Sequence, residues 1–252
     1  GDQAINDDGA VMVFRRMDRI RSFNEETGEL VCEPGVTLHA VTELFSSRGF
    51  MAPITTGSGY HTLGAAVASD MFGTNAHKRG SIAKAVNWVD VTLANGETVR
   101  ADAEHNPDLF SATKGGMGLT GFISLISLTL PKRPAPNVIV RKERCPDLDT
   151  LLERFDNAKK SSDLCYAWID MLAKGNAVGR SILTTAKFTD DPAKPPLFKM
   201  PQIKLPFYLP NFIVNTFSSS LINDIFYRFF ASPAEKIIPY EQFIYPKDLF
   251  LG

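Results

Sequence analysis

The sequence predicts an α+β protein of two parts joined by a proline-rich linker. The first part is rich in short strand patterns and holds two glycine-dense bends, with an Asn-Gly hairpin between them. Three prolines within residues 131–136 then precede a strand-helix-strand-strand pattern, which is the opening of a ferredoxin-like unit. We therefore expect a first domain over residues 1–131 and a second, antiparallel-sheet domain over residues 137–252.

The composition excludes several classes of protein. With 44% hydrophobic and 22% charged residues, the 252-residue chain is typical of a globular protein. A formal net charge of −1 gives no basic excess of the kind that nucleic-acid binding needs. Cys32, Cys145 and Cys165 form no CxxC pair, so we expect three buried thiols rather than a zinc site or disulfides. No uninterrupted apolar run reaches the ~18 residues of a membrane span.

Local patterns predict the elements of the first part in order. Apolar residues indicate strands at residues 10–14 and 30–33, separated by a polar turn at residues 24–28. A helix then begins after Thr37, a favourable N-cap residue, and ends at Gly49. The helical spacing of its apolar residues predicts a buried face of Leu38, Val41, Leu44 and Phe45.

A hairpin and a short helix follow. Residues 86–93 alternate in polarity, and Asn95-Gly96 is a strong signal for a turn into a return strand at residues 97–101. Asn106-Pro107 predicts the start of a short helix with Asn106 as its capping residue.

The second glycine-dense bend, residues 113–121, contains a formal G-x-G-x-x-G. In a nucleotide-binding βαβ unit that motif follows a strand and opens a helix. Here a short helix precedes it and a strand, residues 122–130, follows it, so the Rossmann interpretation fails.

The first glycine-dense bend, residues 53–81, is the feature around which the chain is organised. Between Ala52 and Ser69 it holds no Asp, Glu, Lys or Arg, and most of its residues are Gly, Ala, Ser or Thr. Small residues let a backbone approach a ligand closely, and freed N–H groups can point at phosphate. Two such bends can converge on one extended phosphate-bearing ligand. The alternative is a tightly packed corner without a ligand.

The second part is expected to contain a strand at residues 138–141, a helix at 147–160, and strands at 164–170 and 180–188. The buried face of the helix is predicted to be Leu148, Leu151, Leu152 and Phe155. Residues 197–230 hold three prolines and many aromatic residues. They predict either an irregular core-packing segment or an apolar lid that meets a lipid-like substrate or the membrane surface.

Together these residues resemble the vanillyl-alcohol-oxidase-type (PCMH-type) FAD-binding flavoproteins. The resemblance is carried by GSGYHTLGAAVASDMFGTNAHKRGS, the Asn-Gly hairpin and TKGGMGLTG. In the second part, AWID at residues 167–170, Gly179-Arg180 and QFIYPKD at residues 242–248 are similar to decaprenylphosphoryl-β-D-ribose oxidase and its bacterial homologues. The resemblance implies a PCMH-type domain that is incomplete at its N-terminus, and a substrate-binding cap domain that is incomplete at its C-terminus.

The resemblance also implies the site residues. Those expected to bind FAD are Gly1, Asp2 and Gln3 in a first loop, Gly57 in a turn, Thr62, Leu63, Gly64 and Ala65 along the diphosphate, Ser69, Asp70, Met71 and Phe72 on the flavin side, and Ile123 through its backbone. Gln242 and Tyr245 are expected to line the substrate cavity, or else to be strand residues in the core of the cap. No metal site is expected.

The implied activity is the oxidation of a hydroxyl group of a sugar or polyprenyl-phosphate sugar, with hydride transfer to flavin. Phe72 and Ser69 stand where the arabinan-pathway enzyme has histidine and cysteine, which puts covalent flavin attachment and the substrate in doubt. The alternatives are an aldonolactone or alditol oxidase that uses oxygen and a non-catalytic FAD-fold module. The catalytic base is expected beyond Gly252. A partner reductase is a further expectation. The location is expected to be cytoplasmic or peripheral at the inner face of the membrane.

Three residues of the first bend have simpler interpretations as well. Asp70 is expected to accept a backbone hydrogen bond rather than to act as a base. His61 and His77 are expected to satisfy loop hydrogen bonds, because their spacing does not suit a metal. Trp168, in the second part, is expected to be a core residue.

Overall fold

A computed structural model of the chain describes residues 13–14, 16–192, 215–231 and 234–245. The described chain divides into two compact units. The first unit extends to Pro53 and includes Gly59–Met71 and Ser81–Lys132, and the second holds Ile54–Ser58, Phe72–Gly80 and the residues from Arg133 onward. Two short pieces of the first bend therefore belong to the second unit. The predicted domain limits at residues 131 and 137 stay a prediction.

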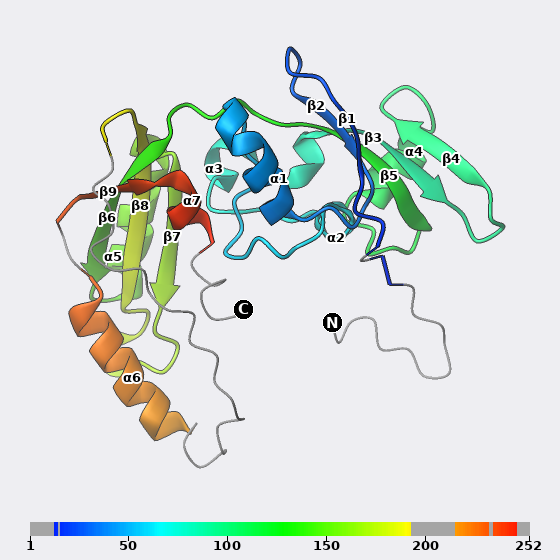
Figure 1. The fold of residues 1–252 in the computed structure, drawn as a ribbon. Helices are drawn as coiled ribbons and strands as arrows, with labels where there is room; N and C mark the ends of the chain where they lie inside the picture. The colour runs from blue at the N-terminus through cyan, green and yellow to red at the C-terminus, as the bar shows by residue number, and fades with distance from the viewer. Residues whose placement is uncertain (1–12, 15, 193–214, 232–233, 246–252) are drawn as a thin grey trace. The chain divides into compact units, whose positions relative to one another are not determined.

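The first unit is built on a five-stranded sheet in the order β1-β2-β5-β3-β4, in which all neighbours are antiparallel (Figure 1). Buried residues alternate with half-buried ones along Glu29–Cys32 and along residues 89–92, so one face of the sheet packs on the core of the unit. The strands are β1 (Ile20–Phe23), β2 (Glu29–Cys32), β3 (Val86–Thr92), β4 (Thr98–Asp102) and β5 (Phe122–Thr129).

Three short helices accompany this sheet: α1 (Leu38–Phe45), α2 (Leu63–Ala68) and α4 (Pro107–Thr113). The cap of α1 is as predicted, because the Thr37 hydroxyl accepts from the Ala40 N–H at 3.1 Å. Short 3₁₀ turns cover Ser46–Arg48 and Ile82–Lys84, and Gly49, with φ 78°, ends the first of them.

Most predicted elements of the first unit are confirmed to within a residue or two, and three details are wrong. Leu44 is 50% exposed and lies outside the buried face of α1. Asn106 has φ 54° and makes no side-chain cap, because its amide donates to the Arg100 carbonyl at 2.8 Å. In the predicted strand at residues 10–14, Val13 and Phe14 are not in a strand, and residues 10–12 lie outside the described chain.

Two glycines in hairpin turns of the first unit, one tightly packed and one open, give a matched test of how closely the chain packs there. Gly28 and Gly96 have φ 75° and 86°, but a Cβ on Gly28 would lie 2.5 Å from the Leu130 carbonyl oxygen, whereas a Cβ on Gly96 meets nothing within 4 Å. We expect Gly96→Ala to cost about 1–2 kcal/mol of unfolding free energy for the left-handed backbone alone. Gly28→Ala should cost about 1–3 kcal/mol more because of the clash. Denaturant unfolding of both variants measures the difference, and equal losses would contradict the close approach.

The second unit is built on a four-stranded antiparallel sheet in the order β7-β8-β6-β9. Its strands are β6 (Asn137–Cys145), β7 (Leu164–Ile169), β8 (Ser181–Thr189) and β9 (Lys236–Pro239). Its helices are α3 (Ala76–Arg79), α5 (Leu148–Ser161), α6 (Thr216–Phe229) and α7 (Tyr240–Ile244), and a 3₁₀ turn covers Gly175–Ala177.

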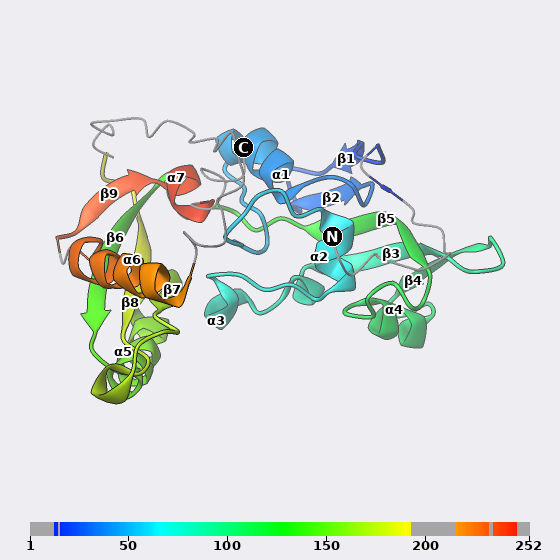
Figure 2. The ribbon, with the colours of Figure 1, turned by 90° about the horizontal axis from the view of Figure 1, so that it is seen from below.

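Helices α5 and α6 lie on opposite faces of this sheet. Leu151 and Ala158 of α5 belong to a core cluster against which Ala167 of β7 packs. Phe226 of α6 packs on Trp168 with ring centroids 4.8 Å apart. Because Ala167 and Trp168 are consecutive in one strand, their side chains point to opposite faces. In Figure 2, β7 and β8 accordingly lie between the two helices.

The predictions for the second unit are confirmed for its strands and for α5, and corrected elsewhere. The Asp147 carboxylate caps α5 by accepting from the Thr150 N–H at 2.8 Å. Leu148 and Leu152 are 42% and 56% exposed, so the predicted buried face was wrong at both positions.

Residues 216–229 form the regular helix α6, so the alternative of an irregular segment is wrong for these residues, and the alternative of an apolar lid stays a prediction. Residues 197–214 of that prediction lie outside the described chain.

The three cysteines are buried free thiols, as predicted. Burial, with a contribution from the neighbouring Glu33 carboxylate, raises the pKa of Cys32 to about 12, so this side chain stays protonated and inert at neutral pH. Among the helices of the described residues, none has the length and apolar character needed to cross a membrane.

Candidate functional site

The two glycine-dense bends lie against each other in the first unit. The Gly115 N–H donates to the Val67 carbonyl at 3.0 Å, and the Met117 N–H donates to the Ala68 carbonyl at 2.8 Å. A Cβ on Gly115, which has φ 83°, would lie 3.3 Å from the Cβ of Asp70. The predicted proximity of the bends is therefore confirmed. We call residues 62–71 and 113–121 the bend pair.

The exposed surface of the bend pair combines small and apolar side chains. Helix α2 buries Leu63, Ala66 and Val67 and leaves only small residues outward, including the exposed Ala65 and, after its end, Ser69. In the other bend, Met117 and Leu119 are 59% and 92% exposed. Large apolar side chains exposed to water near small residues are a feature of ligand-binding surfaces, because a bound ligand removes their apolar area from water.

The N-terminus of α2 offers no free donors to a phosphate. The Leu63 and Gly64 N–H groups donate to the Val36 and Pro34 carbonyls at 2.7 and 2.8 Å. The next two N–H groups donate to the Thr62 side chain and carbonyl. A Cβ on Gly64 would lie 2.5 Å from the Cβ of Pro34, so packing alone explains this glycine. Contacts from Thr62, Leu63, Gly64 and Ala65 to a diphosphate remain a prediction, and they would have to use other atoms.

Asp70 has the backbone-holding role expected of it. The residue has φ 42°, and its carboxylate accepts from the Ala83 N–H at 3.2 Å. The following Met71 accepts from the Ile82 N–H at 2.9 Å through its carbonyl. Asp70 thus ties the end of α2 to the segment that leads into β3, which fixes the shape of the bend.

The remaining predicted cofactor residues fall in different parts of the chain, and their contact with FAD stays a prediction. Ile123 is 8% exposed and pairs with Val91, where the β3–β5 register shifts. Gly57 and Phe72 belong to the pieces of the first bend that pack in the second unit, and Phe72 is 72% exposed. Gly1, Asp2 and Gln3 lie outside the described residues.

Within the second unit, the piece Phe72–Gly80 is bound along β7. The Cys165 N–H donates to the Thr74 carbonyl at 2.9 Å, and His77 Nε2 donates to the Ser162 carbonyl at 3.0 Å. Lys78 pairs with Asp163 at 2.6 Å. His77 therefore satisfies a structural hydrogen bond, as expected, while His61 is exposed.

A buried ion pair fixes α6 to the second sheet. Asp170 is 2% exposed and accepts from Arg180 at 2.6 Å and from the Asn223 amide of α6 at 2.6 Å. Arg180 also pairs with Asp224 of α6 at 2.7 Å. Burial acts to raise the pKa of Asp170, but the hydrogen bonds from Arg180, the Leu172 N–H and Asn223 outweigh it, and the net pKa is lowered.

The substrate-side predictions fall on α7 and its end. Gln242 is exposed and Tyr245 is half-buried, whereas Tyr240, Phe243 and Ile244 supply the buried face of this helix. The alternative of two strand residues is wrong, since neither lies in a strand. Whether they face a substrate stays a prediction.

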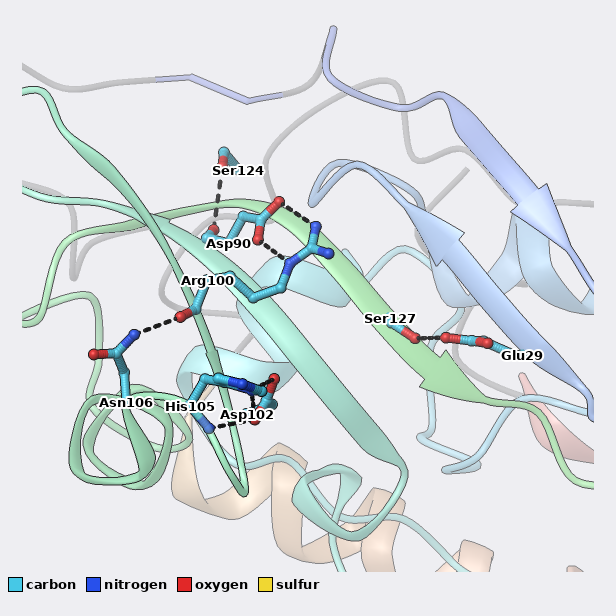
Figure 3. A network of polar contacts seen from close by, with 8 residues as sticks. All are labelled: Glu29, Asp90, Arg100, Asp102, His105, Asn106, Ser124 and Ser127. Carbon is cyan, nitrogen blue, oxygen red and sulfur yellow. Dashed lines mark hydrogen bonds and ion pairs between the residues drawn. The ribbon is translucent and has the colours of Figure 1, made fainter.

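A second polar network, on the hairpin of the first unit, is structural (Figure 3). Arg100 binds both carboxylate oxygens of Asp90, at 2.8 and 3.0 Å, and its guanidinium lies 3.7 Å from the ring centroid of Trp88. The His105 N–H donates to Asp102 at 2.6 Å and is the main cause of the lowered pKa of that carboxyl. These groups satisfy one another and hold β4 and the following turn in place. Sequence reasoning missed this network.

Comparisons with known proteins point to one cofactor. Residues 1–102 match the family model described as FAD binding domain. Decaprenylphosphoryl-β-D-ribose oxidase of Mycolicibacterium smegmatis is 30% identical over 260 residues, 99% of this chain and 56% of that protein.

Two further relatives match parts of the chain. Carbohydrate oxidase of Microdochium nivale is 34% identical over 137 residues, 54% of this chain and 27% of that protein. Bovine (Bos taurus) mitochondrial D-2-hydroxyglutarate dehydrogenase is 29% identical over 155 residues, 59% of this chain and 28% of that protein. The chain spans about half the length of the first curated relatives that it matches, 56% and 49%.

Proposed function

We propose that the protein, whose residues 1–102 match the family model described as FAD binding domain, is an FAD-dependent oxidoreductase that oxidises a hydroxyl group of a sugar. The observation that carries the proposal is the bend pair. Two glycine-dense segments are joined by backbone hydrogen bonds beside an exposed surface of small and apolar side chains. Such a surface fits a flat, largely apolar ring system.

The residues proposed to hold the cofactor are those of the bend pair, with Gly57, Phe72 and Ile123 as further contacts. Small side chains at Ala65 and Ser69 allow close approach, and Met117 and Leu119 would cover an apolar ring and keep water from it. Bound FAD supplies the hydride acceptor for oxidation of a carbinol carbon. The hydroxyl proton needs a base, and we assign none within the described residues.

We propose that the second unit supplies the substrate-binding cap. Its β-α-β-β-α-β order and its strand order β7-β8-β6-β9 support a ferredoxin-like cap, although α6 lies on the face opposite α5. Gln242 and Tyr245 are the substrate-side residues of this proposal.

The proposed location is cytoplasmic or peripheral at the inner face of the membrane, with membrane contact through residues 197–230.

A sugar is the proposed substrate class, in its finer form a polyprenyl-phosphate sugar. This is supported by the match to a decaprenylphosphoryl-β-D-ribose oxidase over 99% of the chain and by the match to a carbohydrate oxidase. An oxygen-using aldonolactone or alditol oxidase is the second candidate, favoured by 26% identity to a putative D-arabinono-1,4-lactone oxidase. A non-catalytic FAD-fold module is the third, favoured by Phe72, which cannot exchange a proton.

Anaerobic reduction of the flavin tests the proposal and separates the candidates. We expect the full-length protein to lose its flavin absorbance when it is mixed with a sugar alcohol or a polyprenyl-phosphate sugar, and to keep it with D-2-hydroxyglutarate. Hydrogen peroxide formation on an aldonolactone or alditol in air would favour the oxygen-using oxidase instead. Flavin that every sugar leaves oxidised would contradict the activity and leave the non-catalytic module.

A further inference from the structure

Helix α6 presents an apolar stripe outward from the second unit. Phe217, Leu221, Ile225 and Phe229 recur every four residues and are 80%, 54%, 48% and 76% exposed. Residues four apart lie above one another on a helix, so these four form one continuous line, which we call the α6 stripe. A helix that covers a sheet ordinarily turns its apolar face inward. The α6 stripe is therefore unusual, because it faces away from the sheet.

The orientation of α6 is fixed by bonds on its other side. The Asn223 amide donates to the buried Asp170 at 2.6 Å, and Asp224 pairs with Arg180 at 2.7 Å. The Tyr227 hydroxyl donates to the Cys145 carbonyl at 3.3 Å. Turning the α6 stripe toward the sheet would break all three bonds and leave the buried Asp170 without Asn223. The stripe is thus held outward by the fold.

A basic groove lies at the C-terminal end of α6. Within the described residues, strand β9 pairs with β6 at Asn137–Val140, and a groove of about 460 Å³ lies beside the rest of β6. Four of its six lining residues are cationic and one is acidic: Arg141, Lys142, Glu143, Arg144, Arg154 and Ala231. We call this the basic groove. The Arg144 guanidinium donates to the carbonyls of Arg228 and Ala231, at 2.7 and 3.3 Å, which places the groove next to the end of α6.

The charge of the basic groove exceeds what its own acid can balance. Glu143 lies 2.9 Å from Arg141 and 3.5 Å from Arg154, so one carboxylate is shared between two guanidinium groups. Lys142 and Arg144 add two further cations. Burial is the main cause of the lowered pKa of Lys142, and the neighbouring cation Lys236 adds to it. An anion in the groove would relieve this repulsion.

We propose that the α6 stripe and the basic groove dock the protein on the surface of an anionic lipid bilayer. The stripe lies at the boundary between headgroups and acyl chains, and the groove binds phosphate headgroups. A helix of 14 residues, about 21 Å long, lies flat at this depth when one side is apolar and cations flank it. The proposal deepens the peripheral membrane contact proposed above.

Charge complementarity selects this occupant over others. A second copy of the chain meeting the same surface about a two-fold axis would bring the same excess of cations to the contact. An apolar protein partner would leave the groove without a counter-charge. An anionic bilayer satisfies both features together, because each Lys or Arg near its surface contributes about 1 kcal/mol.

Vesicle sedimentation with two matched leucine variants tests the stripe. Leu221 on α6 and Leu152 on α5 are 54% and 56% exposed, so Leu→Glu adds the same charge to a similar site on two helices. We expect the wild-type protein to bind phosphatidylcholine vesicles that contain phosphatidylglycerol and not vesicles of phosphatidylcholine alone. Leu221→Glu should weaken binding by about tenfold or more, and Leu152→Glu should leave it unchanged.

A second matched pair tests the groove. We expect Lys142→Gln to weaken binding to the anionic vesicles about fivefold, the equivalent of about 1 kcal/mol for one lysine. Lys160→Gln removes the same charge from the exposed end of α5 and should have no effect.

Several results would overturn the proposal. The first is wild-type protein that does not bind anionic vesicles, and the second is equal binding to anionic and neutral vesicles. The third is the same loss of vesicle binding in both variants of either pair. A larger fall in Tm for Leu221→Glu than for Leu152→Glu would show that the chain itself covers the stripe. A wild-type dimer that becomes a monomer in the Leu221→Glu variant would show that a second copy covers it. Flavin content is measured in the same samples. Protein that keeps FAD but fails to bind vesicles refutes only this proposal, whereas vesicle binding without FAD refutes only the proposed function.

Discussion

Ala65→Trp is expected to abolish retention of FAD, because it places a large ring on the small-residue face of α2 within the bend pair. Ala65 is exposed and its own N–H is bonded to Thr62, so the substitution adds bulk at the surface and leaves the core of the first unit unchanged. If the cofactor lies along this face, the added ring occupies its space. We expect FAD affinity to fall at least tenfold, which is about 1.4 kcal/mol or more.

Ala94→Trp is the matched control. Ala94 is also exposed and belongs to the first unit, but it lies at the tip of the β3–β4 hairpin outside the bend pair. Flavin fluorescence during titration of the FAD-free proteins measures both affinities. If Ala65→Trp binds FAD as tightly as Ala94→Trp does, the cofactor does not lie on α2.

Asp170→Asn is expected to destabilise the second unit by several kcal/mol. The change removes a buried carboxylate from Arg180 and Asn223, and breaking a buried ion pair typically costs about 3–5 kcal/mol. Asp224→Asn is the matched control, because Asp224 pairs with the same Arg180 but its side chain is 35% exposed. This pair is closer to the surface, where an ion pair contributes less, about 0–1 kcal/mol when it is fully exposed, so the control should lose less stability than Asp170→Asn in urea unfolding.

The pH dependence gives the Asp170 prediction a second measurement. The pKa of Asp170 is lowered in the folded state, so its stabilisation is present above the pKa of the unfolded chain, about 3.9. It is lost as pH falls through the folded pKa. The stability difference between wild type and Asp170→Asn should therefore be full near pH 7 and shrink in acid. A difference that stays constant down to the acid limit would show that the carboxylate is not held as an ion.

Features set by neighbouring residues could be predicted from the sequence. Thr37 caps its helix through a residue three positions away, and Asn95-Gly96 forms the expected hairpin turn. The resemblance to FAD-binding flavoproteins is confirmed, since its first-bend residues fall within the family match. The contact between the two bends was also predictable, because two unusual glycine-dense segments on either side of one hairpin can meet.

Features set by distant residues could not be predicted. Gly64 has the appearance of a phosphate-binding glycine. However, its N–H donates to the Pro34 carbonyl, and a Cβ at this position would clash with the Pro34 side chain. Leu152 fits an amphipathic pattern but is exposed, since Leu151 and Ala158 meet the sheet instead. The sequence holds no clear signal for a helix at α6, because the apolar stripe of this helix faces outward. The helix is attached to the sheet by polar bonds to Asp170 and Arg180 instead.

The flavin content of the full-length protein, purified and then desalted after incubation with FAD, tests the central claim most directly. The bend pair predicts a yellow protein that retains FAD in a stoichiometric amount, with the flavin absorbance bands and the cofactor mass found in the same sample. A folded protein that is colourless after desalting, at every FAD concentration used, would contradict the account.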